Sequence, residues 1–225
     1  MSENWSPKEL EAAVVAYLDM RSKELDRIPF KKKDYYVSLT HTYGRTEKSY
    51  EYRMQNISYV FSTMGRRWVT GLKPAKNVGT RVAGEIESII NRLEGNTSSN
   101  IAAFATNVST LRAKNNKKRP KGNKSPKKSQ GQSTQYQRDP EVVAWVLEEA
   151  NGVCESCGLP APFEKDDGTS FLEVHHLRML ADCGSDTITN AVAICPNCHR
   201  ELHYGKKRLE KMKVIFSNVR RLVEE

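Results

Sequence analysis

The chain has 225 residues and a formal net charge of +9, with 36 lysines and arginines against 27 aspartates and glutamates. This length accommodates two modest domains, and the basic balance favours an anionic partner such as a nucleic acid. No run of about 18 apolar residues occurs, which excludes a membrane-spanning helix, and the N-terminus lacks the layout of a secretory signal. We therefore expect a cytoplasmic protein.

The positive charge is concentrated in the middle of the chain. Residues 1–95 carry a net charge of +4, residues 96–138 carry +10 without any acidic residue, and residues 139–225 carry −5. These shifts in composition predict two domains, 1–95 and 139–225, joined by a basic flexible linker, 96–138.

Helices are predicted throughout the first domain. A capping box with proline in the first helical position begins one at Ser6. Apolar residues at helical spacing predict further helices over residues 49–63 and 80–93, whereas residues 30–48 read as irregular. The three apolar stripes predict a small all-α bundle, in which the aromatic and methionine side chains mainly pack the core.

The linker has two parts. Residues 96–116 are ambiguous, and one short helix is possible within them. Residues 114–135 are lysine-rich, of low complexity and too polar to form a hydrophobic core. That second stretch is predicted to be disordered. It could be a solvated tether or a tether that also neutralises phosphates, and in the second case the affinity for DNA should fall steeply with salt.

Two pairs of cysteines frame the second domain. Each pair has CxxC spacing, and 37 residues separate the pairs. In an unsecreted chain such pairs favour zinc over disulfides, and four thiolates form a closed, structural site. The alternative is a set of reduced core cysteines, and Cys183, outside the pattern, reads as a free thiol. The predicted structural Zn²⁺ ligands are Cys154, Cys157, Cys195 and Cys198.

Histidines lie between and after these cysteines. A predicted strand over residues 171–176 ends in His175 and His176, and a second strand over residues 191–195 leads into a helix with His199 and His203 on one face. This order brings His175 opposite the helical pair. Because neighbouring strand residues face opposite sides, we expect one of the doubled histidines to face a metal ion and the other to act on water.

The spacing HH-x13-N-x8-H-x3-H resembles that of the HNH, or ββα-metal, nucleases, and the doubled histidines resemble those of the nuclease colicins. Residues 136–225 closely resemble the C-terminal domain of McrA-type modification-dependent restriction endonucleases. Residues 5–93 resemble, more loosely, helical segments that precede some McrA-like nucleases. The resemblance implies an α+β protein, with an all-α DNA-recognition domain, a disordered basic linker and a zinc-stabilised HNH nuclease domain.

The resemblance also implies roles for individual residues. One divalent ion, such as Mg²⁺, Mn²⁺ or Ni²⁺, would be held by His175, His199 and His203, with positions left open for phosphate and water. His176 would be the general base, and Asn190 would tie down the loop and orient His176. The four histidines could instead be extra zinc ligands or structural residues, and Glu173 could support the site or lie on exposed strand surface.

Binding to double-stranded DNA is expected to depend mainly on the N-terminal domain and the linker, since the nuclease domain is acidic. For each basic candidate in the first domain, a solvated helix face is the alternative. The candidates are Arg45, Lys48, Arg53, Arg66, Arg67, Lys73, Lys76 and Arg81.

The resemblance implies modified DNA as the target, with 5-methylcytosine or 5-hydroxymethylcytosine as the leading choices. Trp68, Tyr43 or Tyr50 could stack on a flipped base, although core packing is the competing interpretation of each.

The leading hypothesis is therefore a type IV-like restriction endonuclease that acts on DNA in the nucleoid. A modification-independent phage or mobile-element HNH nicking enzyme is the alternative within the enzyme class. From another class, the chain could be a non-catalytic zinc-stabilised DNA-binding protein, which would have no need for the histidines. Cutting both strands with one site per chain would favour a homodimer.

Overall fold

The computed structural model describes residues 5–96, 100–114 and 136–225. The chain divides into two compact units, residues 1–134 and 135–225. Among the described residues, no helix is both long and apolar enough to cross a membrane. The fold is mostly helical with one two-stranded sheet, as the predicted α+β class requires.

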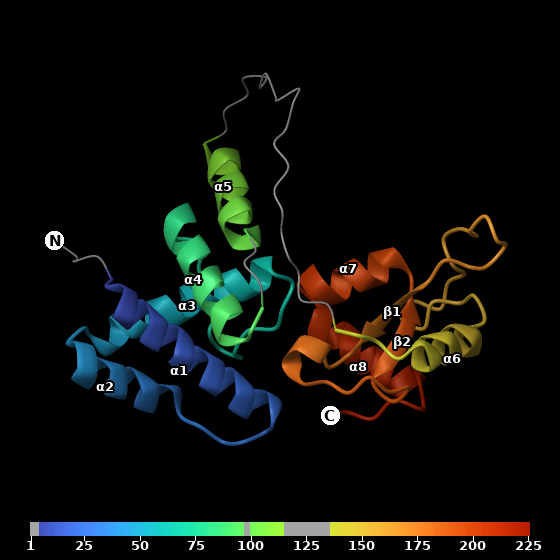
Figure 1. Cartoon of the computed structure of the whole chain (residues 1–225), viewed down its shortest axis with the longest axis horizontal. Coiled ribbons are helices and arrows are strands. Elements are labelled where there is room, and N and C mark those ends of the chain that lie inside the picture. Colours follow the sequence, from blue (N-terminus) through green and yellow to red (C-terminus); the bar gives the residue numbers. More distant parts are fainter. Residues whose placement is uncertain (1–4, 97–99, 115–135) are drawn as a thin grey trace. The chain divides into compact units, whose positions relative to one another are not determined.

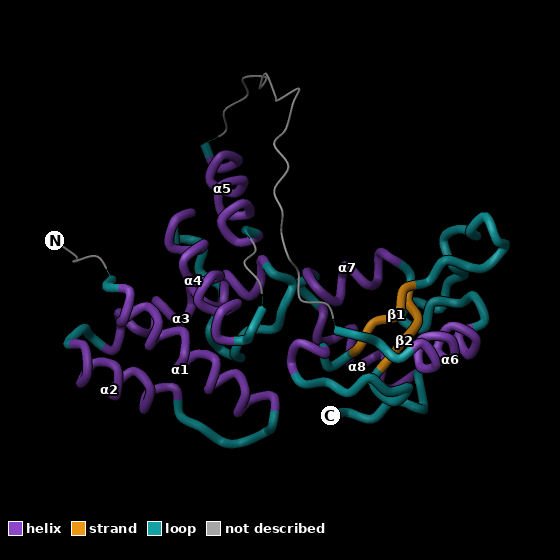
Figure 2. The backbone as a smooth tube through the Cα atoms, viewed as in Figure 1, coloured by secondary structure: helices purple, strands orange, loops and turns teal. Residues whose placement is uncertain are grey.

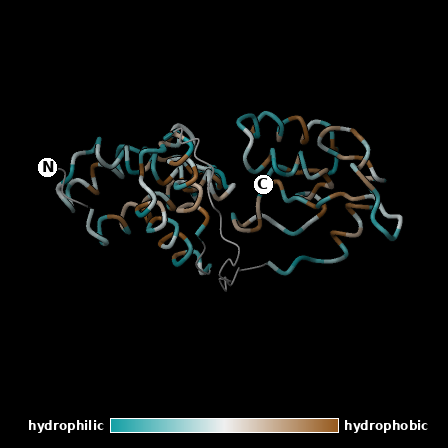
Figure 3. Tube along the Cα trace, turned by 90° about the horizontal axis from the view of Figure 1, so that it is seen from above, coloured by the Kyte–Doolittle hydropathy of each residue, from teal (hydrophilic) through white to brown (hydrophobic). Residues whose placement is uncertain are grey.

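The first unit is a bundle of helices around one hydrophobic core (Figure 1). Figure 3 shows hydrophilic and hydrophobic residues alternating along the helices, as one-sided burial requires. At the start of the first helix, the predicted capping box is confirmed, because Ser6 and Glu9 bond reciprocally to each other's backbone N–H groups. The described helices are α1 (Pro7–Leu25), α2 (Lys32–Tyr43), α3 (Glu47–Thr63), α4 (Thr80–Leu93) and α5 (Ile101–Ala113).

Helix α2 contradicts the irregular chain predicted for residues 30–48. It buries only Tyr36 and Leu39, so its apolar stripe is too narrow for periodicity to detect. Gly44 ends the helix in the left-handed conformation, at φ 80°, and donates to the carbonyl of Thr40. Packing on α1 and α3 therefore stabilises a helix that the local pattern does not reveal.

Helix α5 lies in the segment assigned to the linker, and it packs on α4. The carboxylate of Glu87, fully buried on α4, accepts hydrogen bonds from the backbone N–H groups of Ile101 (3.0 Å) and Ala102 (2.8 Å). These bonds satisfy N–H groups that have no partner within the first turn of a helix. The helical unit thus continues past residue 95. The lysine-rich stretch 115–135 lies outside the described residues.

The second unit surrounds a two-stranded antiparallel sheet, which Figure 2 shows in orange. His175 pairs with Val192 and His176 with Ala191. Both strands contact α6, and α7 packs on β1 and α8. The predicted order of strand, loop, strand and helix is confirmed. Its elements are α6 (Pro140–Ala150), β1 (Glu173–His176), the short 3₁₀ turn η1 (Leu180–Asp182), β2 (Ala191–Ile194), α7 (Pro196–Tyr204) and α8 (Arg208–Asn218).

Candidate metal centres and active site

The four predicted zinc ligands lie together. Their sulfur atoms are all within 4.8 Å of one another. One pair is on the turn after α6, where the N–H of Gly158 donates to the carbonyl of Cys154 at 2.8 Å. The other pair is at the start of α7, with Cys195 as its N-cap. Four convergent sulfurs suit a tetrahedral zinc ion, so this donor set fits a structural zinc site.

The thiols of this cluster have divergent pKa values. Burial would raise the pKa of Cys154, but backbone N–H donors of Cys195, Cys157 and Ser156 outweigh it and lower the pKa to about 7. Burial, together with the neighbouring thiols, raises the pKa of Cys157 to about 12 and also raises that of Cys195. One thiolate therefore forms readily, whereas full ionisation of the cluster needs a cation to offset the repulsion.

The three histidines predicted to bind a divalent ion also converge. The nitrogen atoms of His175 on β1 and of His199 and His203 on α7 all lie within 4.8 Å of one another. The two helical rings face each other across one turn, with 3.2 Å between their Nε2 atoms. Three imidazoles leave coordination positions for other ligands, as catalytic sites require. The donor set fits a divalent ion.

His175 is the buried member of this cluster, with 6 % of its surface exposed. Burial, followed by the proximity of His199 and His203, lowers its pKa well below the usual value for histidine. A protonated ring could not donate a lone pair to a metal. The same burial that disfavours the imidazolium therefore keeps His175 in its metal-binding state at neutral pH.

Glu173 supports the cluster from the same strand. Its Oε2 atom lies 2.7 Å from Nδ1 of His199. Because Nε2 of His199 faces His203, an N–H on Nδ1 donating to the carboxylate leaves Nε2 free for the metal. This is the arrangement of carboxylate, histidine and metal that fixes a ligand's tautomer and orientation. Of the two interpretations of Glu173 left open by the sequence, the contact favours support of the site.

His176 has a different partner, which no sequence pattern predicts. Its side chain is almost wholly buried, and its Nε2 atom lies 2.7 Å from Oδ1 of Asp186. The other oxygen of Asp186 accepts from the backbone N–H of Asp139 at 2.6 Å. Burial would raise the pKa of Asp186, but these two hydrogen bonds outweigh it and lower the pKa. No pattern in the loop distinguishes Asp186 from the other acidic residues of this unit.

Asn190 closes the loop that carries Asp186. Its Oδ1 accepts from the backbone N–H of Arg178 at 2.8 Å, and its Nδ2 donates to the carbonyls of Arg178 and Ser185 at 2.9 and 2.8 Å. The side chain is buried. From the end of the loop between β1 and β2, it therefore holds the start of the loop at Arg178 and its interior at Ser185, beside Asp186.

The basic candidates of the first unit differ in their surroundings. Arg66 is buried and forms two hydrogen bonds with Glu94, at 2.6 and 2.9 Å. Arg45 pairs with Glu9 at 2.8 Å. Arg67 is half-buried, whereas the three lysine candidates, Lys48, Lys73 and Lys76, are exposed. Exposure suits phosphate contact, and buried pairing suits a structural role.

Two arginines lie against the ring of Trp5. The guanidinium of Arg45 is 4.8 Å from its ring centroid and that of Arg53 is 4.4 Å away. Burial lowers the pKa of Arg53 to about 10. Among the aromatic residues considered for base stacking, Tyr50 is fully buried and Trp68 packs against the core, whereas Tyr43 is 36 % exposed. The first two therefore serve the core.

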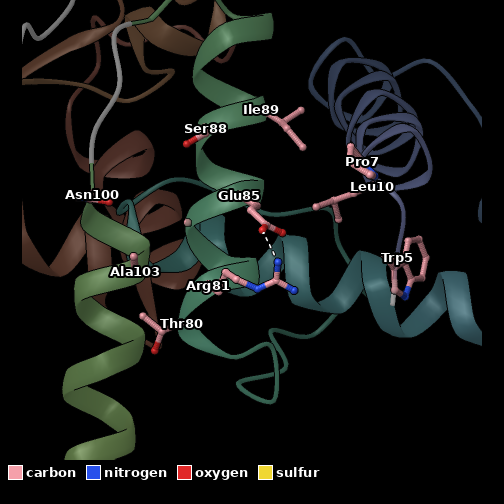
Figure 4. A pocket seen from close by; sticks show the side chains of 11 residues that line it. Trp5, Pro7, Leu10, Thr80, Arg81, Glu85, Ser88, Ile89, Asn100 and Ala103 are labelled. Carbon is pink, nitrogen blue, oxygen red and sulfur yellow. Dashed lines mark hydrogen bonds and ion pairs between the residues drawn. The ribbon is translucent and has the colours of Figure 1, made fainter. Parts of the chain in front are cut away.

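A cavity of about 750 Å³ adjoins Trp5, between the start of α1 and helices α4 and α5. In Figure 4, Arg81 and Glu85 of α4 lie on one wall, joined by an ion pair of 3.0 Å, with Leu10 and Trp5 opposite. The charge of Arg81 is thus partly neutralised, and a phosphate here would compete with Glu85.

Comparison with known proteins places the cysteines and histidines in one family pattern. Residues 154–205 match the family described as HNH endonuclease. The chain is also 47 % identical over 103 residues to the type IV methyl-directed restriction enzyme EcoKMcrA of Escherichia coli K12. That match covers 46 % of this chain and 37 % of the relative, so the chain spans well under half of the relative's length.

Among solved structures, that of the type IV phosphorothioation-dependent restriction endonuclease ScoMcrA is 31 % identical over 37 % of this chain and 19 % of that chain, with a TM-score of 0.34. The sequence matches confirm the predicted resemblance. Residues 154–205 match the HNH endonuclease family, and the chain is similar in sequence to a type IV restriction enzyme.

Proposed function

We propose that this protein is a DNA endonuclease that hydrolyses phosphodiester bonds and restricts modified DNA. The observation that carries the proposal is the convergence of His175, His199 and His203 next to the buried His176 and its partner Asp186, within a stretch of chain that matches HNH endonucleases. A binding module would gain nothing from three imidazoles with their nitrogens turned toward one point.

The chain's own residues support a hydrolytic mechanism. A divalent ion held by the three histidines would supply charge neutralisation for the phosphate and the leaving oxygen. If Nε2–H of His176 donates to Asp186, Nδ1 keeps its lone pair and can accept a proton from water. The ionised carboxylate of Asp186 stabilises the positive charge that His176 then acquires, and Asn190 holds the loop that positions it.

The proposed reaction is a displacement at phosphorus. The water oxygen forms a bond to phosphorus as its proton passes to Nδ1 of His176. The bond from phosphorus to the 3′ oxygen breaks, and its electron pair leaves with that oxygen, which then takes up a proton from solvent water. The products carry a 5′ phosphate and a 3′ hydroxyl. The zinc in the cysteine cluster would have no part in these steps and would hold the start of α7.

The choice of target is assigned to the first unit and the linker. The HNH unit carries a net charge of −5, so tight binding to duplex DNA requires cations elsewhere in the chain. Lys48, Lys73 and Lys76 are exposed and best suited to phosphate contact. The similar enzyme is named methyl-directed, and we extend this to 5-methylcytosine or 5-hydroxymethylcytosine as the target here. Action on DNA in the cytoplasm and a homodimer for double-strand cutting complete the proposal.

The test uses the purified chain, divalent metal, and plasmids that differ only in cytosine modification. We expect cleavage of the modified plasmid alone, and loss of cleavage in His176→Ala with zinc content and DNA binding retained. Equal cutting of both plasmids would support a modification-independent nicking enzyme. Binding without cutting of either would support a zinc-stabilised DNA-binding protein. Cleavage by His176→Ala at the wild-type rate would contradict its role as the base.

A further inference from the structure

The segment that enters α6 lies against the active site. The guanidinium of Arg138 donates from Nη1 to the carbonyl of Val174, at 3.2 Å. Val174 lies between Glu173 and His175 on β1, so this bond fixes Arg138 beside the strand that carries a metal ligand. The next residue, Asp139, donates its backbone N–H to Asp186. The segment is therefore anchored to β1 through Arg138 and to the partner of His176 through the next residue, Asp139.

The charge of Arg138 acts on the site. It contributes to lowering the pKa of both His175 and Asp186, after the larger effects of burial and of closer partners. The rest of this unit, residues 139–225, has 15 acidic and 10 basic residues. A cation at this position therefore opposes the prevailing field of the domain, where a phosphate anion would otherwise be repelled.

The hydrogen-bonding capacity of Arg138 exceeds what its one contact with Val174 uses. A guanidinium has five N–H donors in a planar fork that matches a pair of phosphate oxygens. The side chain is exposed, so a ligand from solution can reach it. Structural arginines in this unit differ from it: Arg208 is buried, and Arg221 bonds to both oxygens of Glu155.

We propose that Arg138 is a catalytic residue of the HNH site, whose guanidinium binds a non-bridging oxygen of the scissile phosphate and stabilises the charge that develops there during displacement. This inference rests on the proposed function. It places one catalytic group at the end of the linker, outside the span of residues 154–205 that matches the HNH family. A donor aimed at developing charge contributes roughly 10²–10³-fold to kcat in comparable sites.

The first experiment compares Arg138→Ala and Arg138→Lys with the wild type on a short duplex that the enzyme cleaves. We expect kcat to fall by about two orders of magnitude for alanine with little change in KM. Lysine should restore part of the rate, because it keeps the charge but not the fork. Arg220→Ala is the matched control, since Arg220 is an exposed arginine of the same unit. Zinc content and thermal unfolding confirm that each variant folds.

A second substrate separates phosphate contact from an indirect effect. In it, a methylphosphonate replaces the scissile phosphate, so a methyl group takes the place of one non-bridging oxygen and the group loses its negative charge. If Arg138 binds that oxygen, the loss caused by Arg138→Ala should shrink to about tenfold or less on this substrate. An equal loss on both substrates, or an alanine variant that cuts the normal duplex within about threefold of wild type, would overturn the proposal.

A binding assay keeps the inference testable if the wild type does not cut. Nicked duplexes ending in a 5′ phosphate or a 5′ hydroxyl at the nick are compared by fluorescence anisotropy. Wild type and Arg220→Ala should prefer the phosphate by about tenfold, and Arg138→Ala should lose that preference. A phosphate preference that survives in Arg138→Ala would refute the phosphate contact. Absence of cleavage with this preference intact would instead refute the proposed nuclease activity alone.

Discussion

Substitution of Glu173 should weaken the histidine site without touching any of its ligands. The carboxylate holds Nδ1 of His199 at 2.7 Å, and such supporting partners contribute about 10–100-fold in metal affinity. The side chains of Glu173 and His199 are partly exposed, with 32 % and 20 % of their surfaces accessible, respectively. Solvent screening therefore places the expected loss for Glu173→Ala near the lower limit, about tenfold or ~1.4 kcal/mol.

The order of metal affinities among the Glu173 variants tests the same role. Glu173→Gln keeps an oxygen that can accept the hydrogen bond from Nδ1 but loses the charge, so its affinity should lie between those of wild type and Glu173→Ala. Titration of zinc-loaded protein with Co²⁺, followed by visible absorption, measures the second site. Asp167→Asn, an exposed carboxylate in the loop before β1, is the control. Affinities of all three proteins within about twofold of one another would refute the orienting role.

Three further predictions concern stability. Removal of zinc by a strong chelator should unfold the second unit, while the first unit, which has its own core, keeps its helices. Limited proteolysis combined with circular dichroism measures the two outcomes, and simultaneous unfolding of both units would contradict the prediction. Tyr17→Phe should lower the free energy of unfolding, measured by urea denaturation, by about 1–3 kcal/mol. The buried hydroxyl bonds to Ser58 at 2.7 Å and to the N–H of Val69 at 3.0 Å, and both groups would lose this partner. The control Tyr52→Phe, at an exposed position, should leave the free energy of unfolding almost unchanged. Hydrogen bonds from Arg45, ahead of those from Ser6, hold the pKa of Glu9 below its usual 4.5. The stabilisation that ionised Glu9 gives the folded protein is therefore present above pH 4.5 and is lost as the pH falls through the folded-state pKa. Glu9→Gln should reduce the fall of the thermal unfolding temperature in acid, and an unchanged pH profile would contradict this role of Glu9.

Local rules explain what the sequence could predict. CxxC turns, a strand ending in paired histidines and an i, i+4 pair on a helix are each set by short-range geometry, so the order of β1, β2 and α7 follows from spacing. The capping box at Ser6 is local in the same way. Such features locate the ligands well, because metal chemistry restricts which side chains can stand at each position.

The missed features all depend on contacts between distant parts of the chain. Asp186 meets His176 because a folded loop brings them together, and Arg66 meets Glu94 across 28 positions. The docking of α5 rests on a buried carboxylate, Glu87, in another helix. Periodicity within a segment cannot report any of these partners. For the same reason, the basic residues of the first unit looked equivalent in the sequence, while the structure pairs some of them and exposes others.

Helix α7 has a consequence beyond either metal centre. Its first turn carries Cys198 and His199, and its last turn carries His203, so the two candidate ions share one rigid element. Fixing the start of the helix with zinc would remove much of the conformational freedom that the histidines must otherwise lose when they bind their own ion. The two ions should therefore bind with positive cooperativity, and by thermodynamic reciprocity an ion at the histidines would slow the escape of zinc from the cysteines.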